Sequence, residues 1–186
     1  MATAGVPVLA GPFCFLRHGE TENNRLALIA GSTDVPLNET GIAQAQASAR
    51  RLAASGIDAI WASPLQRART TARCVAEVLG LTVRIVPQLA ERNWGVLEGR
   101  PRALRVAGVT PADGESPEVF RERTLAGLCA IAASRLPLIV AHSGTFRVLG
   151  ALLGIAERSA PVDNCAPLLF EPHAGGWRVT PFPFGS

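Results

Sequence analysis

Two histidines in this sequence follow directly after apolar runs, and an arginine stands beside one of them. Arg17 and His18 end the run at positions 12–16, and His142 ends the run at positions 136–141. Imidazole changes its charge near neutral pH, so it can serve as a nucleophile or as an acid–base group. A charged, titratable pair at the end of a buried strand is costly unless it faces a cleft. We therefore expect Arg17 and His18 to line a site.

A third segment brings another arginine toward the same place. Arg67 lies in the first turn of a helix predicted at 63–80, which begins where the strand predicted at 58–63 stops. In open α/β sheets, ligands bind at the carboxyl ends of the strands. Both histidines and both arginines should therefore reach one edge of the sheet. Each histidine is closely followed by glycine, which lets the backbone turn sharply beside a ligand.

Each of these residues also has an interpretation without chemistry. A single histidine is more often a core or surface residue than a catalyst. Arg67 could belong to a solvated helix face, and its spacing does not separate the two interpretations. Two histidines at strand ends with arginines near them favour a functional site. His173, in the segment EPHAGG, lacks such a setting and is expected to be structural or exposed.

The elements that must position these groups alternate along the chain. Strands are predicted at 12–18, 58–63, 82–86 and 136–142, helices at 40–56, 63–80, 116–135 and 144–154, and an edge hairpin at 165–182. Thr40 and Ser63 are the candidate N-caps of the first two helices, and Gly56 and Gly80 are the candidate stops. Such alternation predicts an α/β fold: a three-layer sandwich with a mostly parallel central sheet and helices on both faces.

Length and composition are typical of one globular domain. The 186 residues suit a single domain over residues 1–186. We expect residues 1–11 to be a disordered lead and not a signal peptide, because no basic start precedes their apolar stretch. No apolar run reaches the length of a membrane span, so no membrane partner is expected.

Charge and cysteine patterns exclude several further classes. The net charge is +3, and all eighteen basic residues are arginines, so lysine chemistry such as a Schiff base is absent. The arginines are scattered without interleaved aromatic residues, so no nucleic-acid partner is expected. The four cysteines are far apart in apolar stretches, which indicates buried free thiols in a cytoplasmic protein and no zinc site. They are Cys14, Cys74, Cys129 and Cys165.

Five blocks of sequence, in order, resemble the histidine phosphatase superfamily, the phosphoglycerate-mutase-like proteins. The blocks are LRHGETENN, GSTDVPLNETGIAQA, IWASPLQRARTTA, LAERNWGVLEG and IVAHSG, which together extend from about residue 13 to 150. Asn23 departs from the commoner pattern, in which an aromatic residue is frequent at that position. The resemblance implies the phosphoglycerate-mutase-like fold and a metal-independent phosphatase with no cofactor.

The resemblance also implies a role for individual residues. His18 matches the nucleophile that takes the phosphoryl group, and Glu91 matches the acid–base carboxylate. Three residues match the phosphate pocket: Arg17, Arg67 and His142. Asn24 matches an asparagine that contacts the phosphate, and the backbone at Ser143 and Gly144 borders the pocket.

These residue types fit the chemistry of phosphoryl transfer. Two guanidinium groups can hold the three phosphoryl oxygens, and arginine stays charged at any working pH. His18 must be neutral at its attacking nitrogen, and we expect its other ring nitrogen to donate to a backbone carbonyl. Glu91 can protonate the leaving alkoxide and then take a proton from the attacking water. His142 can add a hydrogen bond if it is protonated.

The substrate is the least determined part of the prediction. The lid at 92–115 is short, which resembles the broad-specificity and α-ribazole phosphatases and favours hydrolysis of a small phosphate monoester. A phosphoglycerate mutase or phosphotransferase, and a non-catalytic phospho-ligand binding module, remain as alternatives. Arginines in the lid could bind a second acidic group, although a solvated face is the preferred interpretation. They are Arg100, Arg102 and Arg105. A homodimer is among the assemblies that the sequence allows.

Overall fold

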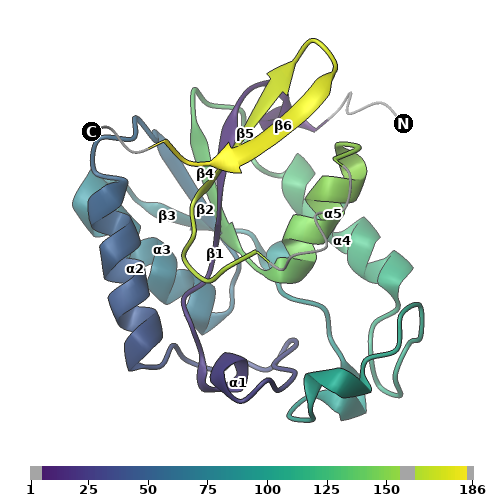
Figure 1. Ribbon diagram of the computed structural model, residues 1–186. Helices are drawn as coiled ribbons and strands as arrows, with labels where there is room; N and C mark the ends of the chain where they lie inside the picture. The colour runs from purple at the N-terminus through teal and green to yellow at the C-terminus, as the bar shows by residue number, and fades with distance from the viewer. Residues whose placement is uncertain (1–5, 156–161, 184–186) are drawn as a thin grey trace.

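A six-stranded sheet forms the centre of the protein (Figure 1). The structure is a computed structural model, and it describes residues 6–155 and 162–183. The strands and α-helices follow in the order β1 (Phe13–Arg17), α1 (Glu22–Arg25), α2 (Glu39–Arg51), β2 (Ala59–Ala62), α3 (Gln66–Leu79), β3 (Val83–Ile85), α4 (Pro117–Cys129), β4 (Pro137–Ala141), α5 (Ser143–Leu152), β5 (Leu168–His173) and β6 (Gly176–Pro181).

Five strands of the sheet run in one direction, and β5 alone runs in the opposite direction. The spatial order is β3-β2-β4-β1-β5-β6. β1, β2, β3 and β4 pair in parallel, while β5 pairs antiparallel to β1 and to β6. The predicted closing hairpin is confirmed as β5 and β6. Four parallel strands share one carboxyl edge, so their following residues can converge there.

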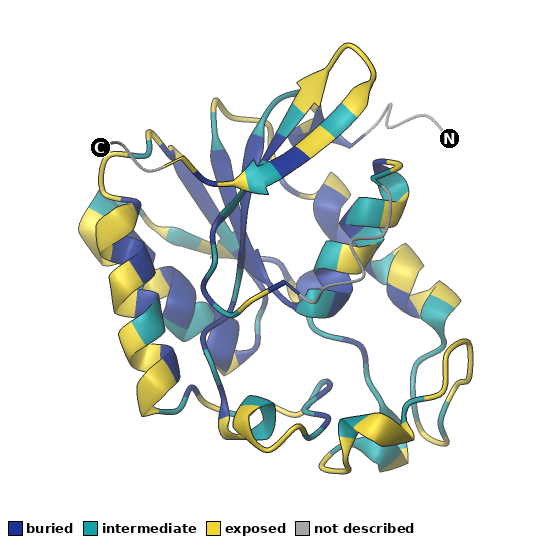
Figure 2. Ribbon diagram, viewed as in Figure 1, coloured by how far each residue is buried: buried dark blue, intermediate teal, exposed yellow. Residues whose placement is uncertain are grey.

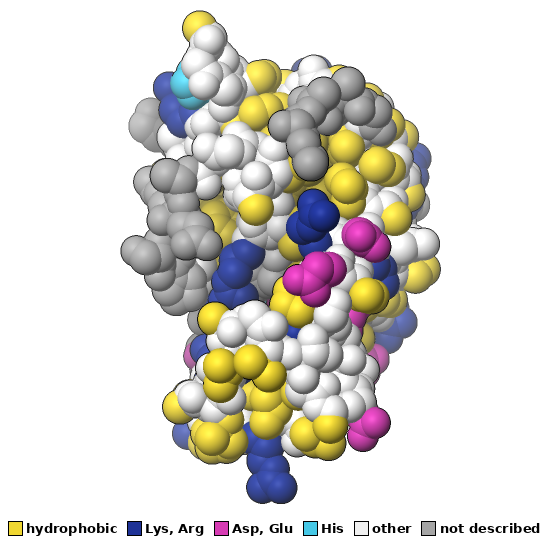
Figure 3. All heavy atoms as spheres, turned by 90° about the vertical axis from the view of Figure 1, so that its right-hand side faces the viewer, with side chains coloured by type: hydrophobic (Ala, Val, Ile, Leu, Met, Phe, Trp, Pro, Cys, Tyr) yellow, Lys and Arg dark blue, Asp and Glu magenta, His cyan; other side chains and the backbone are white. Residues whose placement is uncertain are grey.

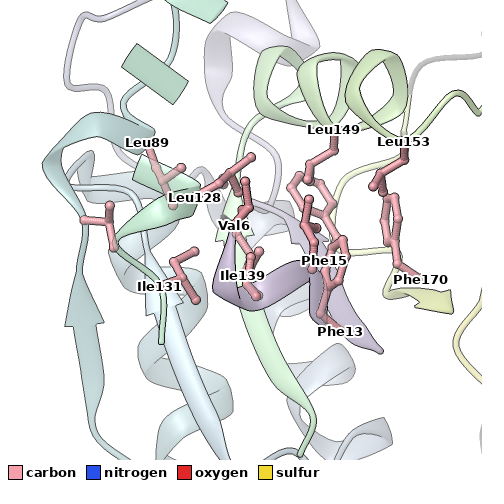
Figure 4. Close-up of a cluster of buried hydrophobic side chains, with 14 of the residues drawn as sticks. Val6, Phe13, Phe15, Leu89, Leu128, Ile131, Ile139, Leu149, Leu153 and Phe170 are labelled. Atoms are coloured by element: carbon pink, nitrogen blue, oxygen red, sulfur yellow. The ribbon is translucent and has the colours of Figure 1, made fainter. Parts of the chain in front are cut away.

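Alternating side chains bury both faces of the sheet. In β1, Phe13 and Phe15 join the hydrophobic cluster beneath α4 and α5, whereas Cys14 and Leu16 join the cluster beneath α2 and α3. Figure 4 shows the hydrophobic cluster beneath α4 and α5, and Figure 2 shows the helices buried on their sheet-facing sides. This alternation arises because successive side chains of a β-strand point to opposite faces of the sheet. The predicted three-layer sandwich is confirmed, with α2 and α3 on one face and α4 and α5 on the other.

The prediction of a disordered lead is wrong for residues 6–11. Pro7–Ala10 form a short 3₁₀ helix, and Val8 and Leu9 are buried in the cluster that contains Phe13. These apolar side chains fill the space between the sheet and α4, so burial orders the segment. Residues 1–5 lie outside the described residues.

Two of the predicted helix caps are wrong. α2 is capped by Asn38, whose Oδ1 accepts the N–H of Gly41 at 2.8 Å, and not by Thr40. α3 begins at Gln66, whose N–H is accepted by Asp34 Oδ1 at 2.5 Å, so Ser63 is not its cap. A carboxylate from a distant loop thus caps α3, which a local capping pattern cannot show. Gly80 does end α3 in a left-handed conformation.

The cysteines are all free, but not all are buried as predicted. Cys14 and Cys165 are buried, Cys74 is half-buried, and Cys129 is exposed. Cys129 is the last residue of α4 and lies outside the apolar stripe of that helix. Across residues 6–155 and 162–183, every helix falls short of the length and hydrophobicity that crossing a membrane requires.

Candidate active site

Three neighbouring strands deliver the central groups of the site. β1 and β4 pair with Arg17 opposite Ala141, and the N–H of His18 donates to the carbonyl of Ala141 at 3.1 Å. His18 and His142 therefore emerge side by side, with ring centroids 5.1 Å apart. On the other side of β4, the N–H of Ser63 donates to the carbonyl of Val140. Because β4 lies between β1 and β2, the residues that follow these three strands meet at the carboxyl edge of the sheet, as predicted.

The His18 imidazole is held in one tautomer. Its Nδ1 lies 2.7 Å from the carbonyl oxygen of Gly19, and because a carbonyl only accepts, Nδ1 carries the proton. The lone pair is then on Nε2. Burial holds the pKa of His18 well below its usual range, and the charges of Arg67 and Arg17 lower it further. His18 is therefore neutral at physiological pH and nucleophilic at Nε2.

The His142 imidazole is bound by a hydroxyl group. Its Nε2 lies 2.7 Å from Ser63 Oγ, which also accepts the N–H of Leu65 at 3.3 Å. Ser63 is then free to donate its own proton to Nε2, which leaves the ring proton on Nδ1. His142 Nδ1 is buried without a hydrogen-bond partner among the described residues. Burial, and secondly Arg67, hold the pKa of His142 well below its usual range, so the ring is neutral. With its proton on Nδ1, the neutral ring can still donate a hydrogen bond.

Arg67 is a buried arginine held by a loop, and not a solvated helix residue. Its side chain is 1% exposed, and its two terminal nitrogens donate to the carbonyls of Thr33 and Gly31 at 2.9 and 2.7 Å. Burial lowers the pKa of the guanidinium. The carbonyls fix the direction of the side chain without neutralising its charge, so the charge remains available to an anion.

Glu98 organises the loop that holds Arg67. Its carboxylate accepts the backbone N–H and the hydroxyl of both Ser32 and Thr33, and the N–H of Trp94 at 3.0 Å. Burial alone would raise the pKa of Glu98, but these hydrogen bonds bring it below its usual value. Glu98 therefore links the lid to the loop that fixes Arg67.

Arg17 is the second guanidinium at the site, and it is half-buried. Its Nη1 donates to the carbonyl of Val162 at 2.7 Å, and its Nε is buried without a partner in the described part of the chain. Burial lowers its pKa to about 10, so the group is still cationic at neutral pH. Arg67 and Arg17 both lower the pKa of His18, so the positive charges of both side chains act on this ring.

Glu91 is anchored at the start of α5. Its Oε2 accepts the N–H of Gly144 at 3.0 Å, and its Oε1 accepts the N–H of Arg92 at 2.8 Å. A Cβ on Gly144 would lie 2.1 Å from Glu91 Oε1, so glycine is needed for this close approach. Ser143, half-buried, is the first residue of the helix. The predicted residues Glu91, Ser143 and Gly144 are therefore brought together.

Asn24 is oriented by its own helix and by a residue from the end of the chain. Its Oδ1 accepts the N–H of Thr21 at 3.2 Å and is 3.4 Å from Asn164 Nδ2, while its own amide N–H groups have no partner in the part of the chain that the structure describes. Asn164 Nδ2 also donates to the carbonyl of His18 at 2.6 Å. Asn164 thus connects the nucleophile candidate to Asn24.

Sequence reasoning missed three residues that support this site: Ser63, Glu98 and Asn164. The sequence around Ser63 resembles a helix cap, and this pattern does not indicate the contact of its hydroxyl group with His142. Glu98 lies in the block LAERNWGVLEG, in which the resemblance assigns a role to Glu91 alone. Asn164 gave no local signal, because its partners are 146 and 140 residues away. The exposed position of His173 agrees with its exclusion from the site.

The electrostatic balance of the site favours an anion. Arg17 and Arg67 are charged, both histidines are neutral, and Glu91 is the nearby carboxylate that acts on both arginines. Among the described residues, no three His, Cys, Asp or Glu side chains gather in a way that could hold a metal ion. The arrangement can bind a phosphoryl group and present a nucleophilic nitrogen to it.

Comparisons with known proteins agree with this geometry. The model of the histidine phosphatase superfamily (branch 1) matches residues 13–182. The chain is 37% identical over 172 residues to a probable phosphoglycerate mutase of Yersinia pestis, covering 81% of this chain and 80% of that protein.

Solved structures of phosphatases have the same fold. One is the mycobacterial glucosyl-3-phosphoglycerate phosphatase in complex with VO3, with a TM-score of 0.78 and 27% identity over 94% of this chain and 100% of that one. Another is a putative α-ribazole-5'-P phosphatase of Escherichia coli, with a TM-score of 0.80 and 26% identity over 94% and 98%.

Proposed function

The chain belongs to the histidine phosphatase superfamily, branch 1, and is a phosphatase; on this basis we propose that it hydrolyses small phosphate monoesters through a phosphohistidine on His18. The observation that carries the proposal is the fixed tautomer of His18. Its Nδ1–H donates a hydrogen bond to the carbonyl of Gly19, so Nε2 is unprotonated, and the charges of Arg67 and Arg17 act on the ring. A neutral imidazole among cations suits attack on a phosphate dianion.

The first step transfers the phosphoryl group to the enzyme. His18 Nε2 forms a bond to phosphorus while the bond from phosphorus to the ester oxygen breaks. Arg17 and Arg67 stabilise the charge on the phosphoryl oxygens, and Asn24 and His142 Nδ1 supply neutral hydrogen bonds. The ester oxygen leaves with a proton from Glu91.

The second step returns the enzyme to its starting state. Water attacks the phosphorus of phosphohistidine, Glu91 takes its proton, and the bond between phosphorus and Nε2 breaks to release inorganic phosphate. Arginine charge takes the role that a metal ion has in other phosphatases, so the proposal includes no metal.

Two other functions use parts of the same arrangement. The similarity to a probable phosphoglycerate mutase supports a mutase or phosphotransferase, which would pass the phosphoryl group to a second hydroxyl and not to water. A non-catalytic phospho-ligand module would need no oriented nucleophile. The fixed tautomer of His18 and the anchored carboxylate of Glu91 therefore argue against that third candidate.

Trapping the phosphoenzyme tests the proposal. Protein dialysed against a strong chelator is incubated with a labelled phosphate monoester and quenched without acid. We expect one phosphohistidine on the wild type, none on His18→Ala, and a rate at least ~10³-fold lower for that variant. Vanadate should inhibit both the labelling and the turnover.

His173→Ala is the matched control, because it removes an exposed histidine that lies outside the site. It should label and turn over like the wild type. Near-normal turnover by His18→Ala would show that another group is the nucleophile. Loss of wild-type activity on chelation, restored by added metal, would show that the arginines do not suffice.

A further inference from the structure

Glu98 has no step in the proposed reaction, yet its carboxylate is bound by residues from two separate segments. Its Oε1 accepts the N–H and the hydroxyl of Ser32 at 2.7 and 2.9 Å, and the N–H of Trp94 at 3.0 Å. Its Oε2 accepts the N–H of Thr33 at 2.9 Å and the hydroxyl of the same residue. Hydrogen bonds to a carboxylate are stronger than those between neutral groups. Glu98 therefore holds Ser32 and Thr33 firmly against the lid.

The loop around Gly31 is shaped for close contact with Glu98. Gly31 has a φ of +56°, and a Cβ there would lie 2.1 Å from Glu98 Oε1, so a side chain is excluded on both counts. The start of the loop also pairs with the lid: the N–H of Gly99 donates to the carbonyl of Ile29 at 2.8 Å, and the N–H of Ile29 donates to that of Arg100 at 2.9 Å. The loop and this part of the lid are therefore held together by backbone and by carboxylate.

The same loop also holds Arg67. Thr33 donates its N–H and its hydroxyl to Glu98, and its carbonyl accepts from Arg67 Nη1 at 2.9 Å. The carbonyl of Gly31 accepts from Arg67 Nη2 at 2.7 Å. Asp34 caps α3 at the residue before Arg67, so the backbone of Arg67 is tied to the loop as well. A displacement of Thr33 should therefore move the guanidinium of Arg67.

Arg67 depends on these carbonyls for its direction. It is 1% exposed, it forms no ion pair with a residue that the structure describes, and its Nε is buried without a partner among those residues. The carbonyls of Gly31 and Thr33 take one donor on each terminal nitrogen, which leaves the other N–H groups for an anion. Displacing a catalytic group by about 1 Å can cost on the order of 10²-fold in rate. The direction of Arg67 should therefore matter for the proposed reaction.

Electrostatics alone would give Glu98 the opposite effect. Arg side chains lie beside a hollow on the face that carries α4, α5 and the lid, so an anion should approach close to the lid (Figure 3). A carboxylate in the lid would repel that anion. Burial lowers the pKa of Arg67, and the charges of Glu91, Asp34 and Glu98 act on it in the opposite direction. Removing the charge of Glu98 should then tighten anion binding, unless its hydrogen bonds are what the site needs.

We propose that Glu98 is a positioning residue: it holds Ser32 and Thr33 so that Arg67 meets the phosphoryl group in the geometry of the transition state. The inference rests on the proposed function, which assigns the phosphoryl group to Arg17 and Arg67. Glu98 acts without touching the substrate, because both of its oxygens are taken by donors of the protein. Without its carboxylate, the phosphate centre would keep all of its catalytic groups and lose the alignment of Arg67.

Two substitutions weaken the hold of Glu98 to different degrees. Glu98→Gln removes the charge and keeps the shape of the side chain. Its NH₂ group must face either the N–H of Thr33 or those of Ser32 and Trp94, and two donors cannot bond to each other. Thr33→Val is the smaller change, because it removes one hydroxyl donor and keeps the charge of Glu98. Both substitutions should loosen the loop that carries the carbonyls for Arg67.

Vanadate binding tests the inference without turnover, because vanadate mimics the five-coordinate phosphoryl group. Its affinity is measured by NMR of vanadium for the wild type, Glu98→Gln, Arg67→Gln and the double variant, each normalised to folded protein. We expect the affinity to fall ~10-fold for Glu98→Gln and ~10²-fold for Arg67→Gln. The double variant should match Arg67→Gln to within about twofold, because Glu98 acts through Arg67. If Glu98→Gln does not fold, the same cycle is run with Thr33→Val, which should lose about two- to threefold on its own.

Glu122→Gln is the matched control, because it removes an exposed carboxylate on α4. It should bind vanadate like the wild type. Unchanged or tighter binding by Glu98→Gln would overturn the inference, and so would an equal factor of loss with and without the Arg67 guanidinium, which is the mark of a merely structural role. Both outcomes would leave the proposed function in place. If Arg67→Gln itself bound vanadate as tightly as the wild type, the proposed function would fail and this inference with it.

Discussion

At the scale of single residues, Glu91 offers the most selective test of the proposed chemistry. Its carboxylate is fixed by the N–H groups of Arg92 and Gly144. An alkoxide leaves only with a proton, whereas a nitrophenolate leaves without one. We therefore expect Glu91→Gln to lower kcat about 10²-fold or more for glycerol 3-phosphate, and less than about 10-fold for p-nitrophenyl phosphate. Steady-state kinetics with both substrates checks this.

Glu77→Gln serves as the control for this test, because it removes one carboxylate from an exposed position on α3. It should alter neither rate. If Glu91→Gln slowed both substrates equally, Glu91 would be a positioning residue for α5 or for an arginine, and the proton donor would have to be sought elsewhere.

The two buried histidines predict how stability depends on pH. Burial, and secondly Arg67, depress the pKa of His18 and of His142 in the folded protein. Below about pH 6.5 the unfolded chain takes up protons that the folded protein does not. Their contribution to stability is therefore complete above pH 6.5 and is lost as the pH falls. Between pH 6.5 and 5.5 each histidine should remove about 1 kcal/mol from the free energy of unfolding.

Urea unfolding in buffers without phosphate measures this effect, because phosphate would bind and stabilise the native state. His18→Gln and His142→Gln should each remove about half of the loss. An undiminished pH dependence in the double variant would show that other groups take up the protons.

The site residues that belong to a recognisable sequence motif could be predicted from the sequence. His18, Arg17 and Glu91 lie in quoted motifs, and the structure brings them together; the donation from His18 Nδ1 to a backbone carbonyl was also predicted correctly. Supporting groups were not predictable in this way. The role of Ser63 depends on the order of β2 and β4, and that of Asn164 on a contact across 146 residues.

At the scale of elements, two glycines let the loop after β1 pack against α2. A Cβ on Gly41 would lie 2.0 Å from the carbonyl oxygen of Glu20, and one on Gly19 would lie 2.4 Å from that of Gly41. Neither glycine has a positive φ, so their role is close approach and not a left-handed turn. The expectation that Gly19 serves a sharp turn is replaced by this steric requirement.

Substitution of Gly41 tests whether this packing matters. Gly41 lies inside α2, where alanine normally stabilises a helix by up to about 1 kcal/mol. The collision with backbone atoms should reverse the sign, so that Gly41→Ala lowers the free energy of unfolding by about 1–3 kcal/mol. Activity should fall as well, because the displaced loop carries His18. Denaturant unfolding and kinetics on the same preparation measure both.

Gly150 provides the matched substitution. It lies in α5, and a Cβ there would meet only the carbonyl oxygen of Ile155 at 4.0 Å. Gly150→Ala should stabilise the protein by a fraction of a kcal/mol up to about 1 kcal/mol. A gain in stability for Gly41→Ala of similar size would show that the loop and α2 shift apart without cost.

Element types were predictable because periodicity is local, but element ends were not. The apolar runs at β1, β2 and β4 and the helical stripe of α3 specify their own secondary structure. The start of α3 depends on Asp34, which is 32 residues away in the sequence. Residues 6–11 are ordered because their apolar side chains pack in the hydrophobic cluster beneath α4. Tertiary partners set both, so local patterns gave the wrong caps and a disordered lead.

At the scale of the whole molecule, the lid separates a phosphatase from a mutase. Residues 92–115 contain only two short 3₁₀ helices, and their larger aliphatic residues are mainly exposed. A mutase must keep water from its phosphohistidine until a second hydroxyl arrives. We expect hydrolysis of 3-phosphoglycerate to exceed its conversion to 2-phosphoglycerate, even with a bisphosphoglycerate primer. A phosphate-release assay beside a coupled assay for 2-phosphoglycerate measures the ratio; isomerisation tenfold faster than hydrolysis would establish the mutase.

The fold of the whole molecule was predictable from the sequence, and the contact between the lid and the loop that holds Arg67 was not. Alternating strands and helices suffice for a parallel sheet covered on both faces. The hydrogen bonds of Glu98 to Ser32 and Thr33 require the lid and this loop to lie side by side, and no pattern in either segment indicates the other.

The position of β1 in the sheet has a consequence for how the protein is made. β1 leaves the ribosome before its two neighbours in the sheet, because β4 and β5 begin only at Pro137 and Leu168. Until those strands emerge, both edges of β1 are unpaired, and His18 lacks the carbonyl of Ala141 and the amide of Asn164. A nascent chain therefore cannot assemble the phosphate pocket until β4 and Asn164 have been synthesised. During that interval β1 is an apolar strand with two open edges, which is the kind of segment that chaperones protect.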